Sequence, residues 1–246
     1  MNLVIDQGNT AVKIAQFIND EISTLKIFNK EDVEDMMEYV QQIQFSVAIY
    51  SSVGGDIFSI QNIISKKADC FIKLSHATPL PITIEYSTPQ TLGVDRIAGA
   101  VGAWCVNKGK TSLVIDAGTA ITYDIVTAEG IYKGGNISPG ISMRFKALNH
   151  YTNSLPLVTL SEVYSLVGRD TESAILSGVM NGVMSEVEGY IDKISKKERN
   201  ISVILTGGDH SVLHNQLKNS TFVPLIDEEY LVLKGLNTIL RYNVEK

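Results

Sequence analysis

The feature that most constrains this chain is a short motif that occurs twice, 110 residues apart. Val4-Ile5-Asp6-Gln7-Gly8 and Val114-Ile115-Asp116-Ala117-Gly118 share Val, Ile, Asp and Gly at matching places. In each copy an apolar run typical of a buried strand ends in Asp-x-Gly, and an alternating strand pattern follows. One copy alone is explained by an ordinary hairpin turn, whereas two copies favour duplicated half-molecules.

The patterns around both copies predict a similar order of elements. In the first half we expect strands over 3–5, 10–18, 22–28 and 46–50, a helix from about residue 31, and a helix capped by Asp56. In the second half we expect strands over 113–115, 121–127, 131–136 and 201–206, with helices near 139–150, 170–195, 210–218 and 229–242. The sequence therefore predicts an α/β protein with halves 1–109 and 110–246 packed around a shared cleft.

Composition argues against several classes of protein. Of the 246 residues, 44% are hydrophobic, which is enough for one large core or two small ones. The formal net charge is −6 and basic residues do not cluster, so we expect no nucleic-acid partner. No stretch of about 18 apolar residues predicts a membrane span. The N-terminal residues lack the pattern of a signal peptide, and the two cysteines lie far apart, so we expect a cytoplasmic protein.

Three glycine turns follow predicted strands and suit the binding of phosphate groups. Small residues let a phosphate approach backbone N–H groups, and an Asp at a strand end can hold Mg²⁺ directly or through water. The turns are Asp6-Gln7-Gly8-Asn9-Thr10, Asp116-Ala117-Gly118-Thr119 and Thr206-Gly207-Gly208-Asp209. At the first of them Asn9 and Thr10 offer side-chain donors, and Lys13 reaches an anionic oxygen from the next strand. Each turn alone is also explained as an ordinary hairpin or strand-to-helix turn, but the three turns together favour a nucleotide-binding site.

A further motif opens a predicted helix at Thr91-Leu92-Gly93-Val94-Asp95-Arg96, with Thr91 as its N-cap. Asp in the first turn is explained by the helix dipole and Arg by solvation, or both by a functional site. Gly99 and Gly102 lower the stability of this helix relative to alanine, which indicates close packing or flexibility beside a cleft. The four histidines do not show zinc-ligand spacing, so a zinc site is not expected.

Taken in order, these motifs resemble those of the type III pantothenate kinases. The matching segments are Asp6-x-Gly8-Asn9-Thr10-x-x-Lys13, Gly93-x-Asp95-Arg96, Asp116-x-Gly118-Thr119-Ala120, Gly134-Gly135-Asn136-Ile137-x-Pro139-Gly140, Leu155-Pro156, Thr171 with Ile175-x-x-Gly178, and Thr206-Gly207-Gly208-Asp209. They extend from about residue 3 to residue 240. The resemblance implies two ribonuclease-H-like halves of the acetate kinase, sugar kinase and actin superfamily, a nucleotide cleft between them, and a homodimer.

The resemblance also implies an activity, the ATP-dependent phosphorylation of the 4′-hydroxyl of pantothenate, which is the first step towards coenzyme A. By similarity Asp95 is the general base, Asp116 holds a monovalent cation (potassium or ammonium), and Asp6 is a candidate ligand of the Mg²⁺ that accompanies ATP. The residues implied in ATP binding are Asp6, Gln7, Gly8, Asn9, Thr10, Ala11, Val12, Lys13 and Thr119. Those implied in pantothenate binding, some across the dimer interface, are Tyr86, Gly93, Val94, Asp95, Arg96 and Thr171.

The position of Arg96 beside Asp95 adds the hypothesis that its planar guanidinium pairs with the pantothenate carboxylate. Three rival functions stay open on the sequence. A non-catalytic, regulatory relative has no need of Asp95 as a base. A kinase of the same fold with another small alcohol as acceptor is disfavoured only by the acceptor motif. A filament-forming, actin-like ATPase is usually longer and has no use for Gly93-x-Asp95-Arg96.

Overall fold

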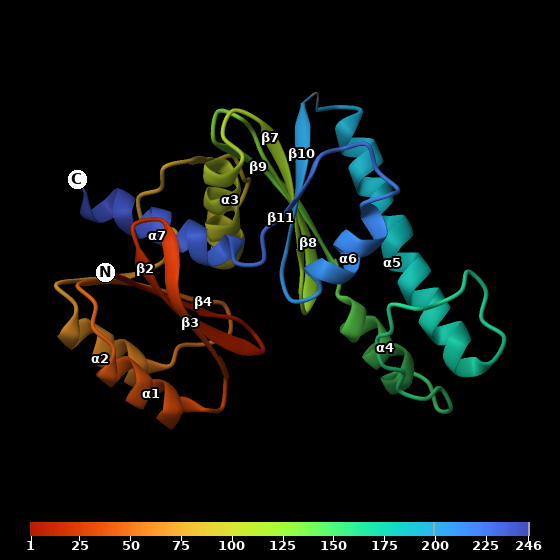
Figure 1. The fold of residues 1–246 in the computed structure, drawn as a ribbon, viewed down its shortest axis with the longest axis horizontal. Helices are drawn as coiled ribbons and strands as arrows, with labels where there is room; N and C mark the ends of the chain where they lie inside the picture. The colour runs from red at the N-terminus through yellow and green to blue at the C-terminus, as the bar shows by residue number, and fades with distance from the viewer. Residues whose placement is uncertain (199, 246) are drawn as a thin grey trace. The chain divides into compact units, whose positions relative to one another are not determined.

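The computed structural model describes residues 1–198 and 200–245, which pack as two compact units (Figure 1). The first unit holds residues 1–108, 129–133 and the chain from Tyr230 onward, and the second holds 109–128 and 134–229. The chain therefore passes between the units at several points, the first of them at Lys108-Gly109. The predicted domain boundaries, 1–109 and 110–246, stay a prediction, and Lys246 lies outside the described residues.

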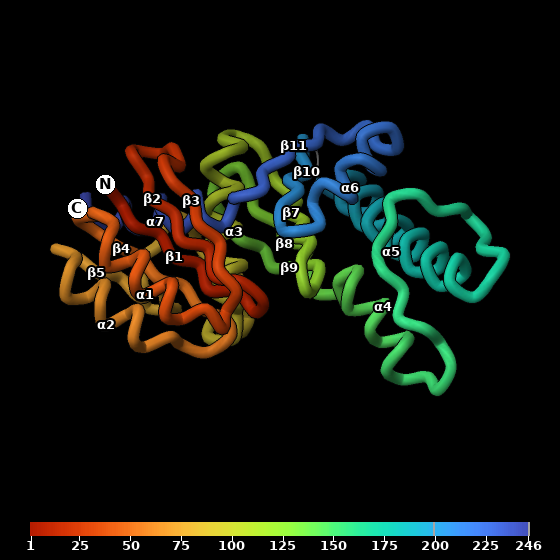
Figure 2. Tube along the Cα trace, turned by 60° about the horizontal axis from the view of Figure 1, so that its bottom comes forward, coloured from red at the N-terminus to blue at the C-terminus, as the bar shows by residue number. Residues whose placement is uncertain are grey.

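A five-stranded sheet of order β3-β2-β1-β4-β5 forms the centre of the first unit. Its strands are β1 (Asn2–Gln7), β2 (Ala11–Ile18), β3 (Glu21–Asn29), β4 (Val47–Ser52) and β5 (Cys70–Lys73). The first three make an antiparallel meander, whereas β4 runs parallel to β1 and β5 parallel to β4. Figure 2 shows these strands side by side in red to orange. The predicted meander is confirmed.

Helices cover both faces of this sheet. They are α1 (Val33–Gln42), α2 (Phe58–Lys67), α3 (Val94–Val106) and α7 (Leu231–Val244). Alternate strand residues such as Leu3 and Ile5 enter one core with α1 and α2. On the other face α7 packs against β1 and β4 and alongside α3. Asn237 of α7 accepts a hydrogen bond from the Asn2 side chain at 2.8 Å, which ties the end of the chain to its first strand.

The second unit is built on a sheet of order β11-β10-β7-β8-β9-β6. The strands are β7 (Thr111–Ala117), β8 (Ala120–Val126), β9 (Ile131–Pro139), β10 (Ile201–Thr206) and β11 (Leu225–Asp227), with the two-residue β6 (Thr83–Ile84) at one edge. β6 pairs with Ile131 and Tyr132, which belong to the first unit. The helices are α4 (Ile141–His150), α5 (Thr171–Ser195) and α6 (His210–Leu217).

The two sheets repeat one topology. The order β9-β8-β7-β10-β11 in the second matches β3-β2-β1-β4-β5 in the first. In both sheets the first two strands of the repeat pair antiparallel, and the last two strands add in parallel. Asp6 pairs with Ser51 of β4, and Asp116 pairs with Thr206 of β10. The repeated strand order confirms that the duplicated Asp-x-Gly motif marks two copies of one α/β unit.

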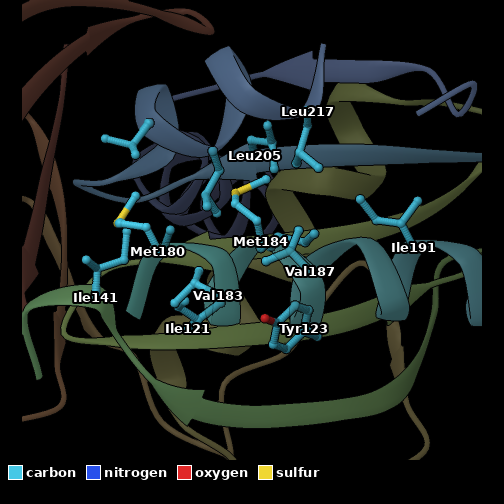
Figure 3. Packing of buried hydrophobic residues seen from close by; sticks show 14 of the residues in the cluster. Ile121, Tyr123, Ile141, Met180, Val183, Met184, Val187, Ile191, Leu205 and Leu217 are labelled. Carbon is cyan, nitrogen blue, oxygen red and sulfur yellow. The ribbon is translucent and has the colours of Figure 1, made fainter. Parts of the chain in front are cut away.

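The core of the second unit lies between its sheet and α5. Apolar residues at helical spacing on α5, including Met180, Val183 and Val187, pack against Ile121 and Tyr123 of β8 (Figure 3). Burial of these side chains provides the main force that holds the 25-residue helix to the sheet. Among the described residues, no helix has the length and apolarity that crossing a bilayer requires.

Two predicted helix caps are wrong. α2 begins at Phe58 after Ile57, and Asp56 instead pairs with Lys73 of β5. Thr91 ends a 3₁₀ turn (Pro89–Thr91), and its hydroxyl donates back to the carbonyl of Thr88 at 2.9 Å. Because that hydroxyl is already used before the helix begins, Gly93 is the N-cap of α3, and α3 starts at Val94.

Candidate functional site

The first predicted nucleotide loop is the three-residue turn between β1 and β2. The N–H of Gly8 donates to the carbonyl of Ala11 over 3.0 Å and closes this turn. Asp6 lies directly opposite Lys13 in the antiparallel pair, so both half-buried side chains extend from the same face of the sheet. The carboxylate offers a ligand for a divalent cation, and the ammonium offers a partner for phosphate oxygens.

Two other members of this segment direct their side chains into the protein. Val12 is fully buried in the core of the first unit. The buried Gln7 donates its side-chain amide to the carbonyl of Gly55, and its oxygen accepts from the hydroxyl of Tyr50. These bonds hold the turn in place. The predicted contacts of Gln7 and Val12 with ATP therefore rest on their backbone atoms.

A second glycine turn of the first unit, Gly54-Gly55-Asp56, was missed by the sequence reasoning. It follows β4 and lies beside the first loop, because a β-carbon on Gly54 would lie 3.2 Å from the side-chain oxygen of Asn9. Lys30 donates to the carbonyl of Gly54 at 2.5 Å. The sequence does contain a signal for this turn, because the same Gly-Gly-Asp triplet recurs in the second half. There Gly207-Gly208-Asp209 follows the equivalent strand β10.

The second predicted loop, Gly118-Thr119, connects β7 and β8. It is one residue shorter than the first loop, and the N–H of Gly118 again donates across the turn, to the carbonyl of Ala120 at 3.0 Å. Gly140, at the N-terminus of α4, donates its N–H to the carbonyl of Thr119 at 3.1 Å. A β-carbon on Gly140 would collide with the carbonyl oxygens of this loop, so only glycine fits.

The third glycine turn lies against the second within the same unit. Gly207 has a φ of +89°, and a β-carbon there would lie 2.5 Å from the carbonyl oxygen of Ala117 and would also meet the Asp116 carboxylate. The N–H of Asp209 donates to that carbonyl at 2.8 Å. Burial raises the pKa of the Asp209 carboxyl. The second unit therefore gathers glycine backbone and two carboxylates at the ends of β7 and β10.

No cage of metal ligands is found among the described residues. Within residues 1–198 and 200–245 there is no group of three His, Cys, Asp or Glu side chains that could enclose a metal ion. Mg²⁺ that accompanies a nucleotide is usually held by one or two carboxylates together with substrate phosphates and water. Asp6, half-buried at the end of a strand beside a glycine turn, fits that mode of binding.

The acceptor motif opens α3 in the first unit. Asp95 is half-buried, and its side chain accepts a hydrogen bond from the N–H of Arg96 at 2.9 Å. Arg96 is only 8% exposed, so solvation does not explain its presence. A β-carbon on Gly102 would collide with the carbonyl of Leu231 in α7, which accounts for this glycine by close packing. Gly99 has no such contact.

The remaining predicted substrate residues lie in different units. The half-buried ring of Tyr86 lies 6.1 Å from the ring of Tyr132, and both belong to the first unit, as do Gly93 and Val94. Thr171 is the exposed first residue of α5 in the second unit, and it lies within the capping box that Asp170 and Ser173 form. The first unit therefore carries every predicted pantothenate residue except Thr171.

Solved structures with the same fold define the class of protein. A Campylobacter jejuni protein provisionally assigned to the Baf family of transcriptional activators matches with a TM-score of 0.64 at 24% identity, covering 99% of this chain and 100% of that one. A Sinorhizobium meliloti protein provisionally identified as a 2-dehydro-3-deoxygalactonokinase gives 0.61 at 12% identity over the full length of both chains. MreB5 of Spiroplasma citri, solved with ADP, gives 0.52 at 12% identity, with 100% and 98% covered. The chain has the two-domain fold of actin-like ATPases and sugar kinases.

Sequence relatives identify the family within this class. The family model of type III pantothenate kinases matches residues 2–193. The type III pantothenate kinase of Christiangramia forsetii is 42% identical over 99% of this chain and 99% of its own length. That of Azobacteroides pseudotrichonymphae genomovar. CFP2 is 43% identical over 98% of this chain and 97% of its own. The chain belongs to the type III pantothenate kinase family.

Proposed function

We propose that this chain transfers the γ-phosphoryl group of ATP to the 4′-hydroxyl of pantothenate, the first step of coenzyme A biosynthesis. The observation that carries this proposal is the 42% identity to a type III pantothenate kinase over 99% of both chains. The acceptor motif with Asp95 and both Asp-x-Gly loops lie within that match. Because ATP and a coenzyme A precursor are cytoplasmic metabolites, the proposal places the enzyme in the cytoplasm.

On the nucleotide side, the two loops supply backbone N–H groups and the first supplies charge. Phosphoryl transfer passes through a loose transition state, so catalysis depends on positioning and on neutralising phosphate charge. Lys13 and the loop from Gly8 to Thr10 bind phosphate oxygens from the first unit, and Thr119 does so from the second. The N–H of Gly8 closes the turn, and the lack of a side chain at Gly8 lets the phosphate approach. Asp6 would hold Mg²⁺, which would supply further neutralisation of the polyphosphate.

On the acceptor side, Asp95 orients the 4′-hydroxyl and accepts its proton. The hydroxyl oxygen bonds to the γ-phosphorus while the bond to the bridging oxygen breaks and ADP leaves. The hydrogen bond from the Arg96 N–H fixes the rotamer of this carboxylate. Tyr86, Gly93, Val94 and Thr171 contact pantothenate. The Arg96 guanidinium, which is 8% exposed, pairs with the pantothenate carboxylate in this proposal.

A monovalent cation, potassium or ammonium, binds at Asp116 in this proposal. Asp116 is half-buried at the end of β7, next to the glycine backbone of the third turn. In a chain with a net charge of −6, a cation there offsets repulsion between ATP and the Asp116 carboxylate. The Asp116 carboxylate and nearby backbone oxygens are ligands that suit a hard cation.

Homodimerisation completes the proposal. Large apolar side chains are exposed along the segment that joins α4 to α5, namely Tyr151, Leu157, Leu160, Val163, Leu166 and Val167. Exposed apolar side chains at this density along one segment are expected where a partner covers the surface. Light scattering coupled to size-exclusion chromatography tests the assembly, and a monomer at micromolar concentration would contradict it.

The proposed activity is tested by following ADP release from Mg-ATP with and without pantothenate, in potassium and in sodium buffer. We expect release that requires both pantothenate and potassium and that collapses in Asp95→Asn. ADP release at the same rate with and without pantothenate would indicate an ATPase or a different acceptor alcohol. Binding of pantothenate without turnover would indicate a regulatory relative.

A further inference from the structure

Glu186, in the middle of α5, joins four elements of the second unit. One of its carboxylate oxygens accepts hydrogen bonds from the hydroxyls of Tyr123 on β8, at 2.8 Å, and Ser138 on β9, at 2.5 Å. The other accepts from the guanidinium of Arg144 on α4 at 2.6 Å. Arg144 also donates from Nε to the carbonyl of Pro139 at 2.9 Å. We name these four side chains the Glu186 cluster: Tyr123, Ser138, Arg144 and Glu186.

The side chains of the cluster are buried or partly buried, so that the loss of a hydrogen bond is not readily replaced by water. Tyr123 is 1% exposed, and the side chains of Arg144 and Glu186 are 21% and 25% exposed. Burial alone would raise the pKa of the Glu186 carboxyl, but the hydrogen bonds from Ser138, Arg144 and Tyr123 outweigh it and lower the pKa. A partly buried ion pair of this kind is costly to break, because one charge is left without its partner.

The cluster borders the junction of β9 and α4, which supports the second nucleotide loop. Ser138 and Pro139, both bonded to the cluster, immediately precede Gly140. Gly140 in turn donates to the carbonyl of Thr119 and lies so close to the loop that no β-carbon fits between them. Because Gly140 is in direct contact with this loop, a displacement of residues 138–140 also displaces Gly118 and Thr119.

We propose that Glu186 and Arg144 are positioning residues for the second nucleotide loop. They fix the end of β9 and Gly140, and this junction holds the backbone of Gly118 and Thr119 in the conformation that receives ATP. This inference rests on the proposed function, in which Thr119 binds ATP. Loss of the cluster weakens nucleotide binding and spares the Asp95 motif, because the latter lies in the first unit.

The test compares Glu186→Gln and Arg144→Met with a control on the same helix. We expect each variant to raise the KM for ATP and the dissociation constant of ADP about tenfold, with the KM for pantothenate changed less than about twofold. The control is Val187→Ala, which removes core packing next to Glu186 and none of the hydrogen-bonding groups of the cluster. Unchanged ATP and ADP constants in both folded variants, or an equal rise in Val187→Ala at a similar loss of Tm, would overturn the proposal.

Two further measurements keep the outcome decisive. If Glu186→Gln does not fold, Ser138→Ala takes its place, since it removes only one neutral hydrogen-bond donor to Glu186. The ADP dissociation constant of Ser138→Ala is expected to rise about threefold. No rise would contradict the proposal. ADP binding measured by calorimetry does not depend on turnover. Failure of the wild type to phosphorylate pantothenate would therefore reject the proposed function and still leave the cluster tested by ADP affinity.

Discussion

Gly207 and Ala117 approach so closely that a β-carbon on Gly207 would lie 2.5 Å from the carbonyl oxygen of Ala117. The same carbonyl accepts the N–H of Asp209 at 2.8 Å. The turn after β10 is therefore packed directly on the strand that ends in the second Asp-x-Gly motif. Gly207 meets two requirements at once, a close approach of backbone to backbone and a φ of +89°.

Gly207→Ala should lower both stability and nucleotide affinity. The positive φ and the collision with Ala117 together cost on the order of 3 kcal/mol of unfolding free energy. Gly208→Ala is the matched control, because a β-carbon on Gly208 meets nothing within 4 Å. Denaturant unfolding and ADP binding measure both effects. Equal behaviour of the two variants would show that the turn is not packed as described.

A second matched pair tests the contact of α3 with α7. Gly102→Ala places a methyl group against the carbonyl of Leu231 and should destabilise the protein by on the order of 3 kcal/mol. Gly99→Ala meets only Val232 at an ordinary 4.0 Å and should stabilise α3 by up to about 1 kcal/mol. Thermal or denaturant unfolding separates the two, and a stabilising Gly102→Ala would contradict the close crossing.

Asp116→Asn should weaken activation by potassium. Removing the negative charge takes away the strongest proposed ligand, so the potassium concentration for half-maximal activity should rise at least about tenfold. Asp192→Asn, which removes an exposed carboxylate paired with Lys196, serves as the control and should leave activation unchanged. Unaltered potassium activation in Asp116→Asn would place the cation elsewhere.

The Glu186 cluster should make stability sensitive to acid. Because the pKa of Glu186 is lower in the folded state, its contribution is complete above the unfolded value and is lost as the pH falls through the folded pKa. Glu186→Gln should therefore be less stable at neutral pH and show a shallower loss of stability below about pH 4.5. Exposed Glu188→Gln, on the same helix, should retain the wild-type slope. Denaturant unfolding across this pH range measures the free energy of unfolding of the wild type and both variants.

Most of the fold was predictable from the sequence, because long elements carry clear periodicity. Strand 201–206 and the helix over 170–195 were predicted within one residue of β10 and α5. The edge strands β5, β6 and β11 were missed. Each has only two to four residues, and so short a segment cannot display the alternation of apolar and polar residues that marks a strand. The two helix caps failed because Asp56 and Thr91 found other partners nearby.

The site was predictable where its residues are adjacent in the sequence. The two Asp-x-Gly loops and the acceptor motif each form one continuous segment, and each lies at a strand or helix end as expected. The Glu186 cluster gave no sequence signal, since its partners lie 42 to 63 residues away and come together only through packing. Comparing the halves beyond their first motif would have revealed Gly54-Gly55-Asp56.

The central claim, phosphorylation of pantothenate, is tested most directly by identifying the product. Phosphorus NMR and mass spectrometry are applied after incubation of the chain with Mg-ATP, potassium and pantothenate. We predict one phosphorylated pantothenate for each ADP, with the phosphate on the 4′-oxygen, and no such product from Asp95→Asn. ADP formed without phosphorylated pantothenate, or an Asp95→Asn variant as active as the wild type, would contradict the account.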